Sequence, residues 1–148
     1  MGSKMTTYTI ERARVYTNEL RNFVNAEGPH IAKIFGNKFN YENAAIEAMI
    51  EKAIFLVGRR NGEIRGVHIS WLVNHPLDTK VKLLSQQLFY VKPDSGRMSY
   101  HLFKKFIDIG KSEANHIITM LTRQTNIKSD TLEKFGFKEL EVLYRLEV

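Results

Sequence analysis

The sequence predicts a mixed α/β domain in which helices cover both faces of one central sheet. Apolar residues repeat with helical spacing before Ala53 and then alternate with strand spacing on both sides of Asn61-Gly62. A strand–helix–strand unit follows from Lys82 to Leu121, and such a crossover is right-handed and joins parallel strands. A last alternating segment runs from Phe137 to Val148. We therefore expect a mixed, mostly antiparallel sheet of about six to seven strands with a parallel crossover.

Length and composition indicate a single domain over residues 1–148. The chain has 148 residues, of which 43% are hydrophobic and 26% charged, which is ordinary for a soluble globular protein. Nine Phe, six Tyr and one Trp exclude a disordered chain, because so much apolar surface is not left in water. Gly2 and Ser3, ahead of a second methionine at Met5, indicate that residues 1–4 are a cloning remnant.

The charge and the absence of cysteine limit the cellular compartments and the kinds of chemistry that are compatible with the sequence. The sequence has no cysteine, which excludes disulfides, thiolate metal sites and a cysteine nucleophile. No apolar run approaches the roughly 18 residues of a membrane span, and charged residues interrupt the N-terminal segment, so we expect a cytoplasmic protein with no membrane partner. The net charge of +6 suits an anionic coenzyme, an acidic partner or nucleic acid. Nucleic acid is the less favoured partner, because the basic residues are dispersed along the chain.

The first third of the chain predicts a short strand around Tyr8 and three helical segments. Thr17 can cap the first helix, which Glu27-Gly28-Pro29 is expected to end. His30 to Phe35 gives a second, short helix, and Asn40 or Asn43 can cap the third. Apolar side chains form one face of each helix: Leu20, Phe23 and Val24; Ile31, Ile34 and Phe35; and Ile46, Met49, Ile50 and Ala53.

The middle of the chain predicts three antiparallel strands. The first is the apolar run Ala53 to Val57, and Asn61-Gly62 is a strong signal for a two-residue hairpin turn. After a loop at His75 to Asp78, Lys82 to Val91 forms the third strand. In the second strand, His68 lies on the face opposite to four apolar side chains: Val67, Ile69, Trp71 and Val73.

A tight turn at Asp94-Ser95-Gly96 opens the longest predicted helix. Ile117 to Leu121 then reads as a buried strand, and Asn126 to Phe135 as a short helix closed by Gly136. The long helix carries a wide apolar stripe: Met98, Leu102, Phe103, Phe106, Ile107 and Gly110.

Three short motifs in the second half of the chain follow one another at regular spacing. They are Leu88-Phe89-Tyr90-Val91-Lys92-Pro93, Gly96-Arg97-Met98-Ser99-Tyr100-His101-Leu102-Phe103 and Leu132-Glu133-Lys134-Phe135-Gly136-Phe137. With the order of elements before them, these motifs resemble the GCN5-related N-acetyltransferase superfamily, in particular divergent, phage-encoded members. The resemblance implies that acetyl-coenzyme A is the co-substrate and binds where two central strands splay apart. It also implies an amine acceptor, either a small molecule or a protein lysine.

The junction between the third strand and the long helix can bind the diphosphate of this coenzyme. The first N–H groups of a helix lack intrahelical partners, and together with the helix dipole they attract anions. The pantetheine arm would pair like an added strand with the backbone of Phe89, Tyr90 and Val91. Asn126 stands near the position of an asparagine that contacts this arm in the family. Gly96 permits the tight turn, and the amides after it would contact the diphosphate: Arg97, Met98, Ser99 and Tyr100.

Acyl transfer to an amine needs an oxyanion donor and can use a proton acceptor. By analogy with the family, the backbone N–H of Val91 is the expected oxyanion donor. Gln86 and Gln87 stand where the family usually has an acidic base, so His68 and Glu63 on the hairpin are the substitutes. For His68, a structural histidine is the open alternative. Tyr144 on the last strand either lines the acceptor pocket or packs in the core. No histidine pair has metal-ligand spacing, so no metal is expected.

Two functions are compatible with these observations. The first is direct transfer of an acetyl group from acetyl-coenzyme A to an amine in a ternary complex, by a monomer or a homodimer. The second is a catalytically degenerate binding module on the same fold, which would hold nucleic acid or an acidic host protein. Leu132 motivates the second function, because it replaces a tyrosine that can protonate the leaving thiolate in the family. The turn after Pro93 is also shorter than the family turn.

Overall fold

One mixed sheet forms the centre of the molecule. A computed structural model describes residues 5–36, 39–120, 127–139 and 146. In these residues, five strands lie in the order β1-β2-β3-β4-β5, and all neighbours are antiparallel except β4 and β5. The predicted fold class is confirmed, with fewer strands than expected, and most of the predicted last strand lies outside the described residues. The strands are β1 (Tyr8–Arg12), β2 (Ile54–Arg60), β3 (Glu63–His75), β4 (Asp78–Val91) and β5 (His116–Ile118).

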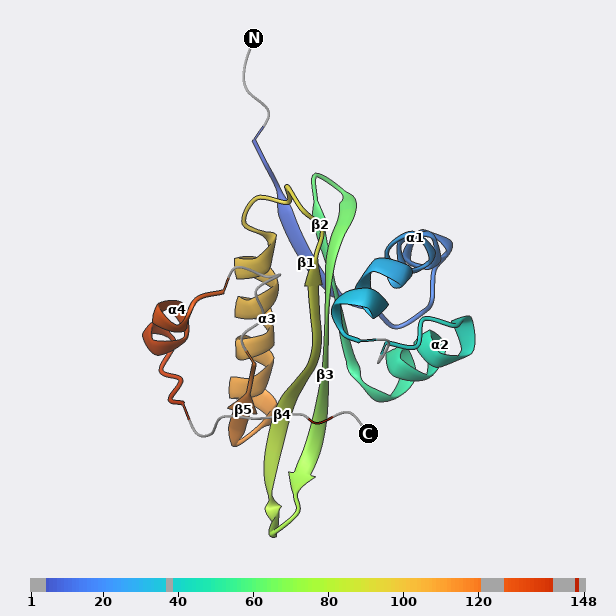
Figure 1. The fold of residues 1–148 in the computed structure, drawn as a ribbon. Coiled ribbons are helices and arrows are strands. Elements are labelled where there is room, and N and C mark those ends of the chain that lie inside the picture. The colour runs from blue at the N-terminus through green and yellow to red at the C-terminus, as the bar shows by residue number, and fades with distance from the viewer. Residues whose placement is uncertain (1–4, 37–38, 121–126, 140–145, 147–148) are drawn as a thin grey trace.

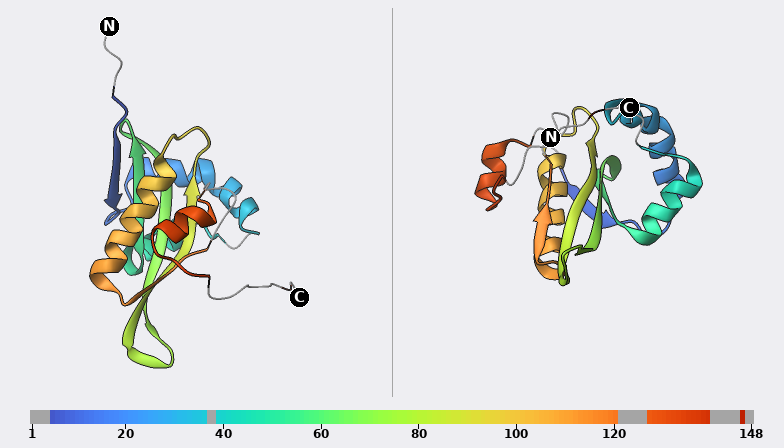
Figure 2. Two further views of the ribbon diagram at one scale, coloured as in Figure 1. Left: turned by 90° about the vertical axis from the view of Figure 1, so that its left-hand side faces the viewer. Right: turned by 60° about the horizontal axis from the view of Figure 1, so that its bottom comes forward.

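Helices cover both faces of this sheet (Figures 1 and 2). Helices α1 (Asn18–Ile34) and α2 (Asn43–Lys52) lie on one face. Helix α3 (Met98–Glu113) lies on the other face, with α4 (Ser129–Lys134) beyond it. The single sheet with helices on two sides agrees with the prediction from the sequence.

Each face of the sheet has its own hydrophobic core. Phe23 of α1 and Ile46 of α2 pack in the first core, and Phe103 of α3 packs in the second. Strand β4 contributes Tyr90 to the first core and Phe89 to the second, because successive side chains of a strand point to opposite faces. The strand is therefore buried on both sides as it approaches α3.

Helix α1 continues through Glu27-Gly28-Pro29, where the sequence predicted that it ends. That prediction was wrong because Phe23 and Ile31, on either side of the triplet, are buried in the same core. Their burial outweighs the one helical hydrogen bond that a proline removes. Gly28 is needed for close packing, since a Cβ there would lie 2.6 Å from Cγ of Tyr41.

Most of the predicted caps and turns are confirmed. Thr17 caps α1, because its Oγ1 accepts a hydrogen bond from Leu20 N at 3.2 Å. Asn61-Gly62 turns the β2–β3 hairpin with φ values of 50° and 84°, and Gly136 follows α4 with a φ of 92°. Helix α2 differs from the prediction, because its N-cap position is Glu42 and neither asparagine caps it.

Strand β4 contains a β-bulge and continues beyond its described pairing with β5. Gln86 pairs with Ser70 of β3, whereas Leu88 pairs with the residue before Ser70, so Gln87 is an extra residue on β4. In the described part of the chain, the parallel pairing with β5 covers Leu83 to Ser85. We call the point where this described pairing ends, next to Gln86, the fork.

Candidate functional site

The fork is bridged by one side chain, that of Gln86. Its Nε2 donates a hydrogen bond to Met120 O at 3.2 Å, and its Oε1 accepts one from Thr119 Oγ1 at 2.8 Å. Only 3% of Gln86 is exposed. Thr119 and Met120 follow directly after β5, so the amide of Gln86 links the two strands one step beyond their backbone pairing.

His68, the predicted base, packs beneath the fork with no exposed surface. The centre of its ring lies 4.9 Å from that of Phe89 and 4.3 Å from that of Phe106, and its Nε2 lies 3.1 Å from Gln86 Oε1. Because the Gln86 nitrogen donates to Met120 O, its oxygen is the acceptor, and His68 Nε2 carries the proton. Burial lowers the pKa of His68 to about 3, so the ring is neutral and weakly basic. A role for His68 as the base stays a prediction.

Beyond the fork, β4 carries the residues predicted to bind the pantetheine arm. Phe89 and Val91 pack in the core under α3. Lys92 N donates to Arg65 O at 2.8 Å, and backbone donors alternate along an antiparallel strand. The N–H groups of Phe89 and Val91 therefore lie on the edge of β4 that faces away from β3. This is also the edge on which Leu83 to Ser85 pair with β5.

The side chain of Tyr90 reaches helix α1. Its hydroxyl donates to Glu27 Oε2 at 3.3 Å, and Lys92 Nζ lies 3.5 Å from Glu27 Oε1. Burial, and after it the charge of Glu27, raises the pKa of Tyr90 to about 12. The phenol therefore stays protonated. The backbone N–H and C=O of Tyr90 face β3, on the edge of β4 opposite to the N–H groups of Phe89 and Val91.

Two arginines from the β2–β3 hairpin hold the turn between β4 and α3. Arg60 Nη1 donates to Asp94 O at 3.0 Å. Arg65 donates to Pro93 O at 2.7 Å and to Ser95 Oγ at 2.9 Å. Neither arginine was predicted from the sequence to belong to the site. The hairpin itself was visible in the sequence, but its place beside the turn follows from the register of β3 and β4.

Tyr8 of β1 lies against the start of α3. The φ of Gly96 is +61°, in the left-handed region that favours glycine, as the predicted tight turn requires. A Cβ at Gly96 would collide with the hydroxyl oxygen of Tyr8. That hydroxyl accepts a hydrogen bond from Arg97 N at 2.9 Å, and the Tyr8 ring stacks on His101 at 4.5 Å. The Tyr8 hydroxyl is therefore the hydrogen-bond partner of the Arg97 N–H, one of the amides that the sequence assigned to a diphosphate.

The first turn of α3 offers two further amides. The helical hydrogen bonds begin with His101 N, which donates to Arg97 O at 3.2 Å. Met98 N is bonded within the preceding turn at 3.3 Å. In the described part of the chain, the amides of Ser99 and Tyr100 are thus the pair at this helix start that can receive an anion.

Positive side chains surround the start of α3. The guanidinium of Arg97 lies 4.9 Å from the centre of the Tyr100 ring. Lys104 and Lys105 are exposed one turn further along. Burial lowers the pKa of His101, and the charges of Arg97 and Lys104 lower it further. This positive surrounding favours an anionic ligand at the helix start.

Two predicted site residues, Asn126 and Tyr144, lie outside the described residues. Leu132, which replaces the tyrosine of the family motif, is partly buried and packs against the core under α3. In the residues that the structure describes, no group of three or more His, Asp or Glu side chains could hold a metal ion. Among the described helices, none is long and apolar enough to cross a membrane.

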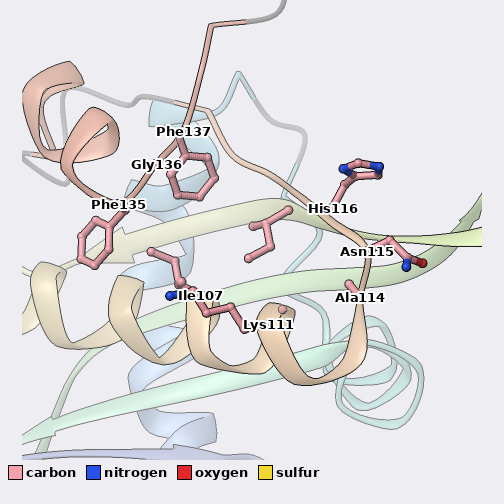
Figure 3. Close-up of a pocket in the computed structure, with 10 residues that line it drawn as sticks. Ile107, Lys111, Ala114, Asn115, His116, Phe135, Gly136 and Phe137 are labelled. Carbon is pink, nitrogen blue, oxygen red and sulfur yellow. The ribbon is translucent and has the colours of Figure 1, made fainter.

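A cavity of about 410 Å³ lies at the other end of α3 (Figure 3). Phe135 and Phe137 line it from the segment that follows α4, and Ile107 and Lys111 line it from α3. Its lining includes none of the residues that the sequence assigned to the coenzyme. The cavity is therefore separate from the fork and from the start of α3.

The chain is similar to solved structures over nearly its whole length, although no family model and no curated protein sequence matches it. A transcriptional regulator from Bacillus halodurans C-125 is 15% identical with a TM-score of 0.71, over 96% of this chain and 100% of that one. A ribosomal-protein-alanine N-acetyltransferase from Brucella melitensis biovar Abortus 2308 is 13% identical with a TM-score of 0.67, over 98% and 100%. A glucosamine-6-phosphate N-acetyltransferase from Arabidopsis thaliana is 12% identical with a TM-score of 0.64, over 95% and 98%. At these identities the likeness is one of fold.

Proposed function

Because the chain has the fold of the GCN5-related N-acetyltransferases, we propose that it transfers an acetyl group from acetyl-coenzyme A to an amine. One observation carries the proposal: the edge of β4 beyond the fork leads directly into the turn that begins α3. An extended arm can pair with a strand edge, and a diphosphate can bind at a helix start. One continuous stretch of chain therefore offers the contacts that both parts of the coenzyme need.

In this proposal, the pantetheine arm lies along β4 at Phe89 to Val91. The diphosphate meets the amides of Ser99 and Tyr100 and is neutralised by Arg97 and Lys104. Arg60 and Arg65 support the site indirectly, since their hydrogen bonds fix the turn between β4 and α3.

The proposed reaction is direct attack in a ternary complex. The nitrogen of the neutral amine attacks the thioester carbonyl carbon, the N–C bond forms, the C–S bond breaks, and the coenzyme leaves as a thiolate. The proton that the nitrogen loses passes through solvent and converts the thiolate to a thiol. The chain has no cysteine for an acyl-enzyme.

In this scheme we assign His68 a positioning role through Gln86, in place of the role as base predicted from the sequence. A ring with a pKa of about 3 would hold the proton of an amine too weakly to help its attack. Its Nε2–H instead fixes the oxygen of Gln86 at the fork. Asn126 keeps the place at the pantetheine arm that the resemblance implies. Tyr144 keeps both places predicted from the sequence, the acceptor pocket or the core.

The proposed acceptor is a primary amine, either a small molecule or a protein lysine, in the cytoplasm. Proteins with similar structures are named for acceptors as different as a ribosomal-protein alanine, glucosamine-6-phosphate and an aminoglycoside. The fold is therefore compatible with amines of several sizes.

A melting curve tests this proposal. Acetyl-coenzyme A at a hundred times its Kd should stabilise the native state by about 2.7 kcal/mol, which raises the Tm by about 5–10 °C for a chain of this length. Inorganic diphosphate is the control, because it has the charge of the coenzyme without the arm, and it should shift the Tm less. An unchanged Tm at millimolar acetyl-coenzyme A would contradict the proposal. It would favour a binding module for nucleic acid or an acidic host protein.

A further inference from the structure

The amide of Gln86 is held firmly at the fork. Its hydrogen bonds reach Met120 O at 3.2 Å, Thr119 Oγ1 at 2.8 Å and His68 Nε2 at 3.1 Å. The partners come from β3 and from the segment that follows β5, while Gln86 itself belongs to β4. Turning the amide away would leave polar groups without partners in the interior, which is unfavourable. The side chain therefore forms a fixed link between β4, β3 and the segment that follows β5.

His68 prevents the amide from moving toward α3. Its ring packs against those of Phe89 and Phe106, and it is fully buried. Ser70, the next residue of β3 on the same face, is also fully buried. The space beneath the amide is thus filled by packed side chains.

The direction of the proposed coenzyme brings its acyl group to this link. A diphosphate at the start of α3 lies beyond the C-terminal end of β4, so the arm runs back along the strand from Val91 past Phe89. The thioester is at the end of the arm far from the diphosphate. The acyl group is therefore the part of the ligand closest to Gln86.

We propose that the Gln86 side chain blocks the acyl end of the coenzyme on the edge of β4 and restricts the enzyme to short acyl groups. This inference rests on the proposed function. A longer acyl chain would have to enter the space in which the amide spans the fork. It could do so only by breaking the hydrogen bonds that tie Gln86 to its neighbours, so acetyl is accepted and butyryl is rejected.

Binding of acyl-coenzyme A thioesters tests the inference without knowledge of the acceptor. Titration calorimetry would give Kd values for coenzyme A, acetyl-coenzyme A and butyryl-coenzyme A. We expect the wild type to bind the butyryl thioester at least about tenfold more weakly than the acetyl thioester. Gln86→Ala removes the amide and should bring the two affinities to within about twofold, with the affinity for coenzyme A unchanged.

The neighbouring residue provides a matched control. Gln87 is exposed, and its amide donates to Ser85 Oγ at 3.2 Å on the same strand. Gln87→Ala removes the same group as Gln86→Ala, one residue away, and should keep the wild-type ratio of the two affinities.

Each outcome has a distinct meaning. Equal affinities of the wild type for the acetyl and butyryl thioesters would overturn the inference, even if Gln86→Ala fails to fold. A folded Gln86→Ala protein that keeps the wild-type ratio would overturn it as well. A wild type that binds neither coenzyme A nor its thioesters would instead refute the proposed function, and the inference with it.

Discussion

At the scale of single residues, the neutral state of His68 makes the stability of the protein depend on pH. The pKa of an unfolded histidine is near 6.5, whereas burial lowers that of His68 to about 3. Between these values the unfolded chain binds a proton that the folded protein does not bind. The contribution of His68 to the free energy of unfolding is therefore complete above about pH 6.5. It is lost as the pH falls toward 3, by about 1.4 kcal/mol per pH unit.

Replacement of His68 should flatten this dependence. His68→Phe loses the hydrogen bond to Gln86, which lowers the free energy of unfolding by about 1–3 kcal/mol at neutral pH. Between pH 6 and pH 4, however, that free energy should fall less steeply than in the wild type. Urea unfolding at several pH values gives both slopes. Exposed His116 is the control, and His116→Phe should keep the wild-type slope. Equal slopes for His68→Phe and the wild type would mean that His68 titrates normally in the fold.

Strand alternation predicted which way His68 points, but not what covers it. The sequence placed His68 opposite Val67 and Ile69, and the structure confirms that these two lie in the other core. The burial of His68 depends on Phe106, which arrives from a helix much later in the chain. The sequence showed that Gln86 stands where the family usually has an acidic base. It could not show the hydrogen bond between Gln86 and Thr119, because that residue also comes from a later part of the chain.

At the scale of elements, the turn between β4 and α3 is assembled from distant parts of the chain. The glycine turn and the start of the helix are local features, and both were predicted from the sequence. The contacts of Tyr8, Arg60 and Arg65 come from β1 and from the β2–β3 hairpin, so they depend on strand pairing. Local sequence patterns contain no information about such distances.

A carboxylate in the first turn of α3 should separate folding from coenzyme binding. Ser99→Asp puts a negative charge where the helix dipole favours it, by about 0.3–1 kcal/mol. The same charge repels a bound diphosphate by roughly 1–4 kcal/mol. The variant should therefore melt no lower than the wild type, yet bind acetyl-coenzyme A about tenfold or more weakly.

The last turn of α3 supplies the control for this variant. Ser112 is exposed near the C-terminal end of the helix. Ser112→Asp adds the same charge where the dipole disfavours it, so it should lower the Tm slightly and leave the Kd for acetyl-coenzyme A unchanged. The same Kd in Ser99→Asp and the wild type would show that the turn has a structural role alone.

At the scale of the whole molecule, the predictions that succeeded rest on short-range chemistry. Helical and strand periodicity gave the order of elements, and the turn residues gave the hairpin at Asn61-Gly62 and the end of α4 at Gly136. The break predicted at Glu27-Gly28-Pro29 failed because the core holds α1 together across it. The fork follows from the pairing of β4 with β5, which only the assembled sheet determines.

Amide hydrogen exchange with and without acetyl-coenzyme A tests the central claim most directly, because it shows where the coenzyme lies. The account predicts slower exchange at Phe89 on the edge of β4 and at Ser99 and Tyr100 in the first turn of α3. Ile107, Lys111 and His116, which line the cavity at the other end of α3, should exchange at unchanged rates. Protection confined to that cavity, or no protection at saturating coenzyme, would contradict the account.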